Sequence, residues 1–141
     1  MPDKVFVDTN VWLYALLPQQ SDAKHRRAEK FVFSLVRPWI NSQVIRETSS
    51  NLLKKGNVAE DRLREMIGDW YQGCEIHPSN ADQHFLASDL RERHTFSYWD
   101  SLIVAAALDA GCTTLYSEDM QHGRVLLGQL TIVNPFADTL F

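Results

Sequence analysis

The chain has 141 residues, the length of one ordinary domain, so we expect a single domain over residues 1–141. Hydrophobic residues make up 45% of the sequence and aromatic residues 11%, which is enough to fill a core without disulfide bonds. The 14 Lys and Arg against 18 Asp and Glu give a formal net charge of -4. That charge argues against a protein that coats nucleic acid nonspecifically, so local patches or a bound metal must hold any phosphate-bearing partner.

Nothing in the sequence indicates export or a membrane. The start, Met1 to Lys4, lacks the basic region and apolar segment of a signal peptide. The longest apolar stretch, Leu102 to Leu108, is far below the roughly 18 residues of a membrane span. Cys74 and Cys112 are the only cysteines, and we interpret them as buried thiols rather than a disulfide or a metal pair. We therefore expect a cytoplasmic protein with no membrane partner.

Strands and helices are predicted to alternate along the chain. Short apolar runs bounded by turn residues predict strands at Val5–Val7, Trp39–Asn41, Cys74–His77, Thr113–Tyr116 and Leu130–Val133. Apolar residues at helical spacing predict helices at residues 11–16, 22–36, 42–55, 57–71, 81–94 and 98–108.

Cap residues support several of these boundaries. Ser42 is a candidate N-cap, and Asn57 to Glu60 has the spacing of a capping box. Gly111 ends the helix that begins near Ser97, which is so apolar that it must be buried on most faces. Short strands that alternate with helices predict an α/β fold with a central parallel sheet between helical layers.

Four carboxylates fall where such a fold places reacting groups, beyond the carboxyl ends of the strands. Asp8 follows the first predicted strand, and Asp119 lies three residues past Tyr116. Asp100 stands at the start of the most buried helix, and Glu47 lies at the border of the apolar face of another helix. The sequence therefore predicts that these four acids converge.

Clustered carboxylates repel one another unless a cation compensates them. Hard oxygen ligands suit Mg²⁺ or Mn²⁺, and the chemistry this implies is phosphodiester hydrolysis with a metal-bound water as nucleophile. Each acid also has a purely structural interpretation. Asp8 and Asp100 occupy helix-capping positions, Glu47 is a candidate solvated helix acid, and Asp119 is a candidate turn residue.

Four motifs in chain order carry a family resemblance. They are Val7-Asp8-Thr9-Asn10, Ile45-Arg46-Glu47, Tyr98-Trp99-Asp100 before an apolar helix, and Leu115-Tyr116-Ser117-Glu118-Asp119. Together they resemble a PIN domain and, more narrowly, the VapC-type toxin ribonucleases of type II toxin–antitoxin systems. The resemblance spans Val5 to Phe136. It implies a three-layer α/β/α sandwich and a Mg²⁺- or Mn²⁺-dependent endoribonuclease, with a cognate antitoxin, an RNA substrate and a homodimeric assembly.

The resemblance also implies roles for individual residues. It assigns catalysis and metal binding to four acids, namely Asp8, Glu47, Asp100 and Asp119. It assigns a supporting polar role to Asn10 and Ser117. Some family members place a further acid where this sequence has Gln121, so the choice between one metal ion and two stays open.

The candidate substrate-binding residues are basic. Arg26, Arg27 and Lys54 are placed to hold an RNA backbone, although charged runs of this kind are usually solvated faces. Trp12 and Trp99 each lie within four residues of a candidate ligand. Stacking on an unpaired base is possible for both, and core packing is the favoured prediction.

Two other functions compete with the nuclease. A haloacid-dehalogenase-like phosphatase would use Asp8 as its nucleophile, but it would want a second Asp where Asn10 stands. A non-catalytic binding module of PIN fold would be expected to lose acids from the quartet, and all four are present.

Overall fold

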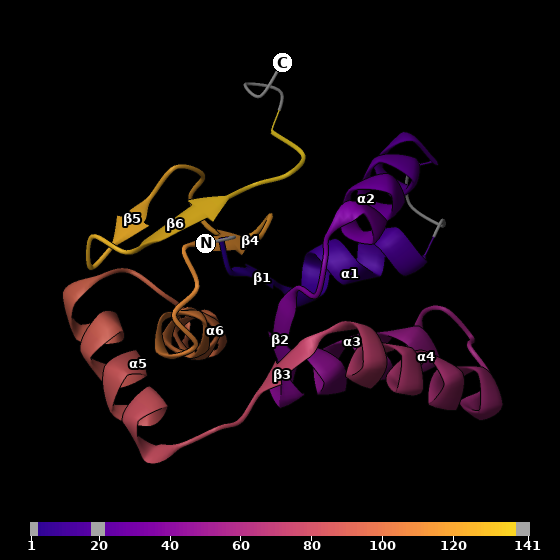
Figure 1. Cartoon of the computed structure of the whole chain (residues 1–141), viewed down its shortest axis with the longest axis horizontal. Helices are drawn as coiled ribbons and strands as arrows, with labels where there is room; N and C mark the ends of the chain where they lie inside the picture. The colour runs from indigo at the N-terminus through magenta and orange to yellow at the C-terminus, as the bar shows by residue number, and fades with distance from the viewer. Residues whose placement is uncertain (1–2, 18–21, 138–141) are drawn as a thin grey trace.

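The structure is a computed structural model that describes residues 3–17 and 22–137. Its strands are β1 (Val5–Val7), β2 (Trp39–Asn41), β3 (Glu75–His77), β4 (Thr114–Tyr116), β5 (Val125–Leu126) and β6 (Leu130–Val133). Its helices are α1 (Thr9–Leu16), α2 (Asp22–Ser34), α3 (Ser42–Lys54), α4 (Glu60–Gly73), α5 (Ala81–Arg93) and α6 (Tyr98–Asp109). Figure 1 shows how these elements follow one another.

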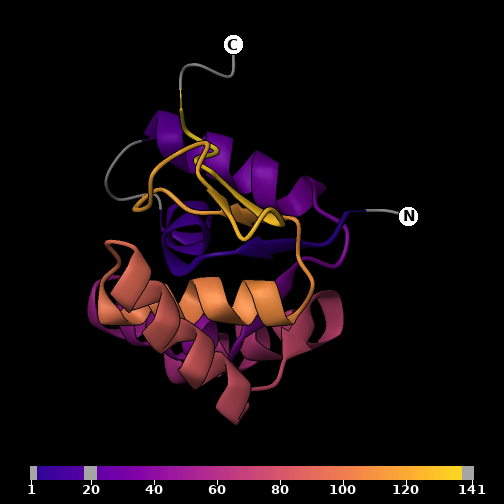
Figure 2. The same ribbon diagram turned by 90° about the vertical axis from the view of Figure 1, so that its left-hand side faces the viewer.

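The strands form one sheet in the order β3-β2-β1-β4-β6-β5. Every pairing is parallel except that of β5 with β6, and helices lie on both faces of the sheet, with α2 on one side and α6 on the other (Figure 2). The predicted α/β sandwich is therefore confirmed, with a mixed rather than wholly parallel sheet. Strand β5 was not among the predicted strands, because two residues are too few to show an alternation of apolar and polar positions.

The strand order reverses between β1 and β4. The chain moves outward from β1 to β2 and β3, then returns to place β4 on the other side of β1. At such a reversal the loops leave the sheet in opposite directions and open a crevice beyond the carboxyl ends of the strands. Asp8 N donates to Tyr116 O at 2.9 Å, so the residue after β1 lies beside the end of β4.

Side-chain caps fix several helix starts. Asn41 Oδ1 accepts from Val44 N at 3.1 Å, so Asn41 rather than Ser42 caps α3. The capping box predicted from Asn57 is wrong, because Asn57 is in the left-handed region (φ 49) and α4 begins at Glu60 without a side-chain cap. Gly111, with φ +78, ends α6 as predicted, in a conformation that L side chains rarely adopt.

The core lies between the sheet and the helices. Helix α6 is buried over most of its length from Ser101 to Leu108, as its apolar sequence predicts. Cys74 and Cys112 are free and buried, which confirms the prediction of buried thiols. Burial raises the pKa of these thiols to about 11 and about 12. No helix in the described part of the chain is long and apolar enough to cross a membrane.

The far end of α6 is held by a polar cluster, here called the Asp109 cluster, of His77, Asn80, Gln83 and Asp109. His77 Nε2 lies 2.7 Å from Asp109 Oδ2, and the side-chain amides of Asn80 and Gln83 donate to the same oxygen at 2.9 and 3.0 Å. These contacts lower the pKa of Asp109, and the hydrogen bond with His77 contributes most. The cluster joins the segment between β3 and α5 to the C-terminal end of α6.

Candidate active site

The structure brings the four predicted acids together. Asp8, Glu47, Asp100 and Asp119 line one cavity of about 150 Å³, here called the acidic cavity. The acids come from four separate segments: the end of β1, helix α3, the first turn of α6 and the loop after β4. Convergence at the carboxyl edge of β1 and β4 follows from the reversal of strand order at that point.

Asp8 is the most buried acid of the cavity, with 5% of its surface exposed. Thr9 N donates to its Oδ1 at 2.7 Å, and Ser117 Oγ donates to its Oδ2 at 2.9 Å. Burial raises the pKa of Asp8 to about 7, and the charges of Asp100 and Glu47 add to the effect while these two hydrogen bonds oppose it. Asp8 is thus both the N-cap of α1 and a destabilised carboxylate in the cavity.

Asn10 and Ser117 support Asp8 from neighbouring segments. Asn10 Nδ2 donates to Ser117 Oγ at 3.5 Å, and Asn10 Oδ1 accepts from Glu118 N at 3.2 Å. Because Ser117 in turn donates to Asp8, these bonds tie the start of α1 to the loop after β4. Both residues are thus connected to Asp8 through hydrogen bonds, and their supporting role in catalysis stays a prediction.

Glu47 is oriented by two residues that the sequence analysis did not select. Thr9 Oγ1 donates to Glu47 Oε1 at 3.2 Å, and Gln43 Nε2 donates to the same oxygen at 3.3 Å. Gln43 lies four residues before Glu47 on α3, so helical spacing placed it on the same face. Once Glu47 is chosen as a candidate, that spacing is a signal from which Gln43 could have been found.

Asp100 lies in the first turn of α6, and its carboxylate lines the acidic cavity. Its backbone N–H donates to Ser97 Oγ at 3.1 Å, so Ser97 caps α6. Burial, followed by the charge of Asp119, raises the pKa of the Asp100 carboxyl, and Ser97 opposes that rise. The backbone of Asp100 therefore belongs to the helix cap while its carboxylate lines the acidic cavity.

The donor chemistry of the cavity fits an oxygen-preferring divalent cation. Four carboxylates line it, and burial, with a smaller contribution from the charges of Asp100 and Glu47, raises the pKa of Asp8. Across residues 3–17 and 22–137, however, no three His, Cys, Asp or Glu side chains are close enough to bind one ion together. The arrangement therefore suits a divalent cation that keeps several waters and takes one or two carboxylates directly.

The predicted substrate-binding residues lie outside the acidic cavity. Arg26 and Lys54 are exposed, and Arg27 is half-buried beside Lys24 and Glu118. Lys55, rather than Lys54, lines a cavity with Asn10 and Asp119.

The two tryptophans near the acids differ sharply. Trp12 is buried, and its ring packs edge-on against Trp70 with centroids 6.3 Å apart. Trp99 is 60% exposed and lines the acidic cavity. The prediction of core packing is thus confirmed for Trp12 and wrong for Trp99.

The sequence matches the PIN domain family over residues 5–125. The chain belongs to the PIN domain family. The matched segment contains all four acids of the cavity and ends at the first residue of β5. Strand β6, which pairs with the central strand β4 of this PIN domain, lies beyond it. No curated protein sequence matches the chain.

Solved structures share the fold of this PIN domain. VapC20 of Mycobacterium tuberculosis, a sarcin-ricin loop cleaving toxin, has 21% sequence identity and a TM-score of 0.65 over 82% of this chain and 90% of that chain. A toxin–antitoxin complex from Klebsiella pneumoniae has 18% identity and a TM-score of 0.69, over 94% and 98%. VapBC2 from Rickettsia felis, bound to a DNA fragment from its promoter, has 18% identity and a TM-score of 0.61, over 92% and 98%.

Proposed function

We propose that this PIN domain is a metal-dependent endoribonuclease, the toxin of a toxin–antitoxin pair, that hydrolyses RNA phosphodiester bonds at the acidic cavity. The observation that carries the proposal is the convergence of four carboxylates from distant segments on one cavity at the strand-order reversal. Such a cluster destabilises the fold, and a divalent cation relieves the repulsion between the carboxylates and can also bind an RNA phosphate. When bound, Mg²⁺ or Mn²⁺ activates water for attack and shields charge that develops on the phosphate oxygens.

The chain's own residues fix the carboxylates in place. Both oxygens of Asp8 accept hydrogen bonds, one from Thr9 N and one from Ser117 Oγ, so its orientation is set before any ligand arrives. Thr9 Oγ1 and Gln43 Nε2 hold Glu47 Oε1 in the same way. Because the pKa of Asp8 is about 7, its carboxyl group is present in both protonated and ionised forms at neutral pH when no cation is bound.

The partners follow from the same proposal. Toxin–antitoxin complexes among the structures of similar fold support an antitoxin as the protein partner of this chain. The sarcin-ricin loop cleavage named for VapC20 supports RNA as the substrate class. We also propose that the chain forms a homodimer and acts in the cytoplasm. A small adjacent reading frame that encodes a DNA-binding protein would support the pairing.

The test is cleavage of single-stranded or loop RNA by the purified protein, freed of antitoxin. We expect cleavage with Mg²⁺ or Mn²⁺, none in excess EDTA, and products with 5′-phosphate and 3′-hydroxyl ends. Asp8→Asn should abolish cleavage, whereas Asp69→Asn, which changes an exposed acid on α4, should cleave like the wild type. Undiminished cleavage in EDTA, or 2′,3′-cyclic phosphate ends, would contradict the proposed chemistry.

A second assay separates this function from the alternatives. Expression of the chain alone should arrest bacterial growth, and Asp8→Asn should remove the arrest at equal protein level. Release of inorganic phosphate from small phosphomonoesters, without RNA cleavage, would favour the phosphatase. RNA or protein binding with no cleavage under any metal would favour a non-catalytic module.

A further inference from the structure

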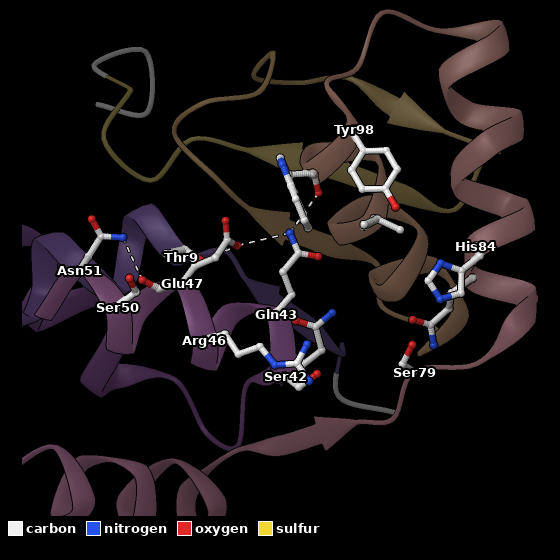
Figure 3. Close-up of a pocket in the computed structure, with 14 residues that line it drawn as sticks. Thr9, Ser42, Gln43, Arg46, Glu47, Ser50, Asn51, Ser79, His84 and Tyr98 are labelled. Atoms are coloured by element: carbon white, nitrogen blue, oxygen red, sulfur yellow. Dashed lines mark hydrogen bonds between the residues drawn. The ribbon is translucent and has the colours of Figure 1, made fainter. Parts of the chain in front are cut away.

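A larger cleft opens beside the acidic cavity, between α3 and α6. It has a volume of about 720 Å³ and is here called the α3–α6 cleft (Figure 3). It shares four lining residues with the acidic cavity, namely Thr9, Gln43, Glu47 and Trp99. Glu47 is the acid that lines both, so a chain in the cleft would lie next to the acidic cavity.

Two neighbouring aromatic residues line the α3–α6 cleft. Trp99 is 60% exposed and Tyr98 is 51% exposed, and their rings are perpendicular with centroids 5.0 Å apart. The guanidinium of Arg91 lies 4.8 Å from the Tyr98 centroid and is anchored by a 2.7 Å hydrogen bond to Ser101 Oγ. Tyr98 thus contacts both a cation and the indole ring, and Trp99 is the more exposed aromatic residue at the cleft.

The backbone of Trp99 is tied to the acidic cavity. Gln43 Nε2 donates to Trp99 O at 3.2 Å while it also donates to Glu47 Oε1 at 3.3 Å. One amide group therefore links the first turn of α6, the site of the indole, to a carboxylate of the cavity. A ligand that stacks on Trp99 would be positioned relative to Glu47 by this link.

The rest of the lining is polar. Figure 3 shows Tyr98 and His84 on one side of the cleft, with Ser42, Gln43 and Arg46 on the other. Among the described residues that line it, Leu102 is the one with an aliphatic side chain. A groove for an amphipathic helix would offer several aliphatic anchors, whereas amides, hydroxyls and aromatic rings suit the edges and faces of nucleobases.

We propose that the α3–α6 cleft binds an unpaired nucleobase of the RNA, stacked on Trp99, next to the phosphodiester held at the acidic cavity. The inference rests on the proposed ribonuclease function and assigns Trp99 as a substrate-positioning residue. It restricts the substrate to RNA in which the base beside the cleaved bond is free to leave a stack. Aromatic side chains stack on every base, so Trp99 supplies affinity and position rather than a strict choice of base.

The experiment measures equilibrium binding of a short single-stranded RNA to the non-cleaving Asp8→Asn protein in Mg²⁺. A series of oligonucleotides carries one abasic site at each position in turn. We expect one position at which the abasic site weakens binding about 5- to 150-fold, the range found when one base–aromatic stack is removed. In the Asp8→Asn, Trp99→Ala protein the same abasic site should change the dissociation constant less than about twofold, because the stack is already lost.

Two variants serve as controls. Trp99→Phe keeps an aromatic face and should restore most of the abasic effect. Tyr71→Ala removes an aromatic side chain of similar exposure (57%) on α4 and should leave the full effect in place.

The outcomes separate the inference from the proposed function. An equal abasic effect with and without Trp99, or no single-stranded RNA binding, overturns the inference, while metal-dependent cleavage by the wild type keeps the proposed function. A change in oligomeric state or antitoxin binding on Trp99→Ala, with RNA binding intact, also overturns it and assigns this face to a protein partner. No RNA cleavage by the wild type under any metal would instead defeat the proposed function itself.

Discussion

Helix α6 has an aspartate near each end, and the two aspartates lie in opposite environments. Asp100, in the first turn, lines the acidic cavity, where burial and the charge of Asp119 raise the pKa of its carboxyl. Asp109, the last residue, accepts contacts from His77, Asn80 and Gln83, which lower the pKa of its carboxyl. The same residue type is thus destabilised as an anion at one end of the helix and stabilised as an anion at the other.

The difference distinguishes two uses of acidic residues. The Asp109 cluster is complete, because its hydrogen-bond donors satisfy the carboxylate within the chain. In the acidic cavity, burial and then neighbouring negative charges raise the pKa of Asp8 and Asp100, and a cation from outside the chain would compensate their charge. This contrast predicts that the cavity governs activity and that the cluster governs stability.

The largest expected effect comes from a matched pair of substitutions in α6. Asp100→Asn should lower RNA cleavage by at least about 100-fold, since even residues that merely support a metal site cost 10- to 100-fold when changed. Asp109→Asn should leave cleavage unchanged. The measurement is the initial rate of cleavage of one RNA by both proteins at saturating Mg²⁺. Equal losses in the two proteins would show that the ends of α6 do not differ in function.

The pH dependence of stability is expected to be large in the absence of metal. The pKa of Asp8 is raised from 3.8 to about 7 in the folded protein, so its protonated form favours folding. The stability that this proton provides is fully present below pH 3.8, falls as the pH rises, and is lost above about pH 7. The total loss is about 4 kcal/mol.

Denaturant unfolding in EDTA at several pH values between 4 and 8 measures this effect. The Asp8→Asn protein has no titrating carboxyl group at this position, so its free energy of unfolding should vary much less over the same pH range. A wild-type slope that persists in Asp8→Asn would mean that other groups cause it.

Magnesium should reverse part of that cost. Mg²⁺ at 100 times its dissociation constant should stabilise the wild type by about 2.7 kcal/mol, because the unfolded chain has no preformed site. For a domain of this size that corresponds to roughly 5 to 11 °C in melting temperature. Asp100→Asn should be as stable as the wild type or more so in EDTA, and its shift on adding Mg²⁺ should shrink or vanish. An equal Mg²⁺ shift in both proteins would remove Asp100 from the site.

The sequence predicted the fold and the convergence of the acids because local signals were strong there. The apolar sequence of α6 indicates a buried helix, and that of β1 indicates a buried strand. Reacting groups in a parallel sheet gather beyond the carboxyl ends of the strands, which predicts that Asp8 and Asp119 lie together. Helix starts were harder, since Asn41 and Ser42 are both good caps and only the backbone conformation decides between them.

Other features depended on contacts between distant segments. The exposure of Trp99 could not be predicted, because the same aromatic residue at the start of an apolar helix is usually core. The Asp109 cluster joins residues that are 26 to 32 positions apart in the sequence, and no local sequence pattern predicts such contacts.

The smallest expected effect is on the stability of the Asp109 cluster. Asp109→Ala removes the oxygen that accepts from Asn80 and Gln83, but Gln83 Nε2 keeps its 2.8 Å bond to Pro78 O and is not left without an acceptor. Because the Asp109 carboxylate is partly exposed, solvent already screens it, and we expect a loss of only about 1 kcal/mol in the free energy of unfolding. The pKa of Asp109 is lowered below 3.8, so this stability is present above pH 3.8 and disappears as the pH falls through the folded-state value.

Denaturant unfolding of Asp109→Ala and wild type at pH 7 and near pH 2 checks the size and direction of the change, with Asp69→Ala on α4 as an exposed control. RNA cleavage by Asp109→Ala at 25 °C should match the wild type, because the cluster lies at the opposite end of α6 from the acidic cavity. Loss of cleavage in a protein that remains folded would connect the two ends of the helix, and the Asp109 cluster would then belong to the active site rather than to the fold alone.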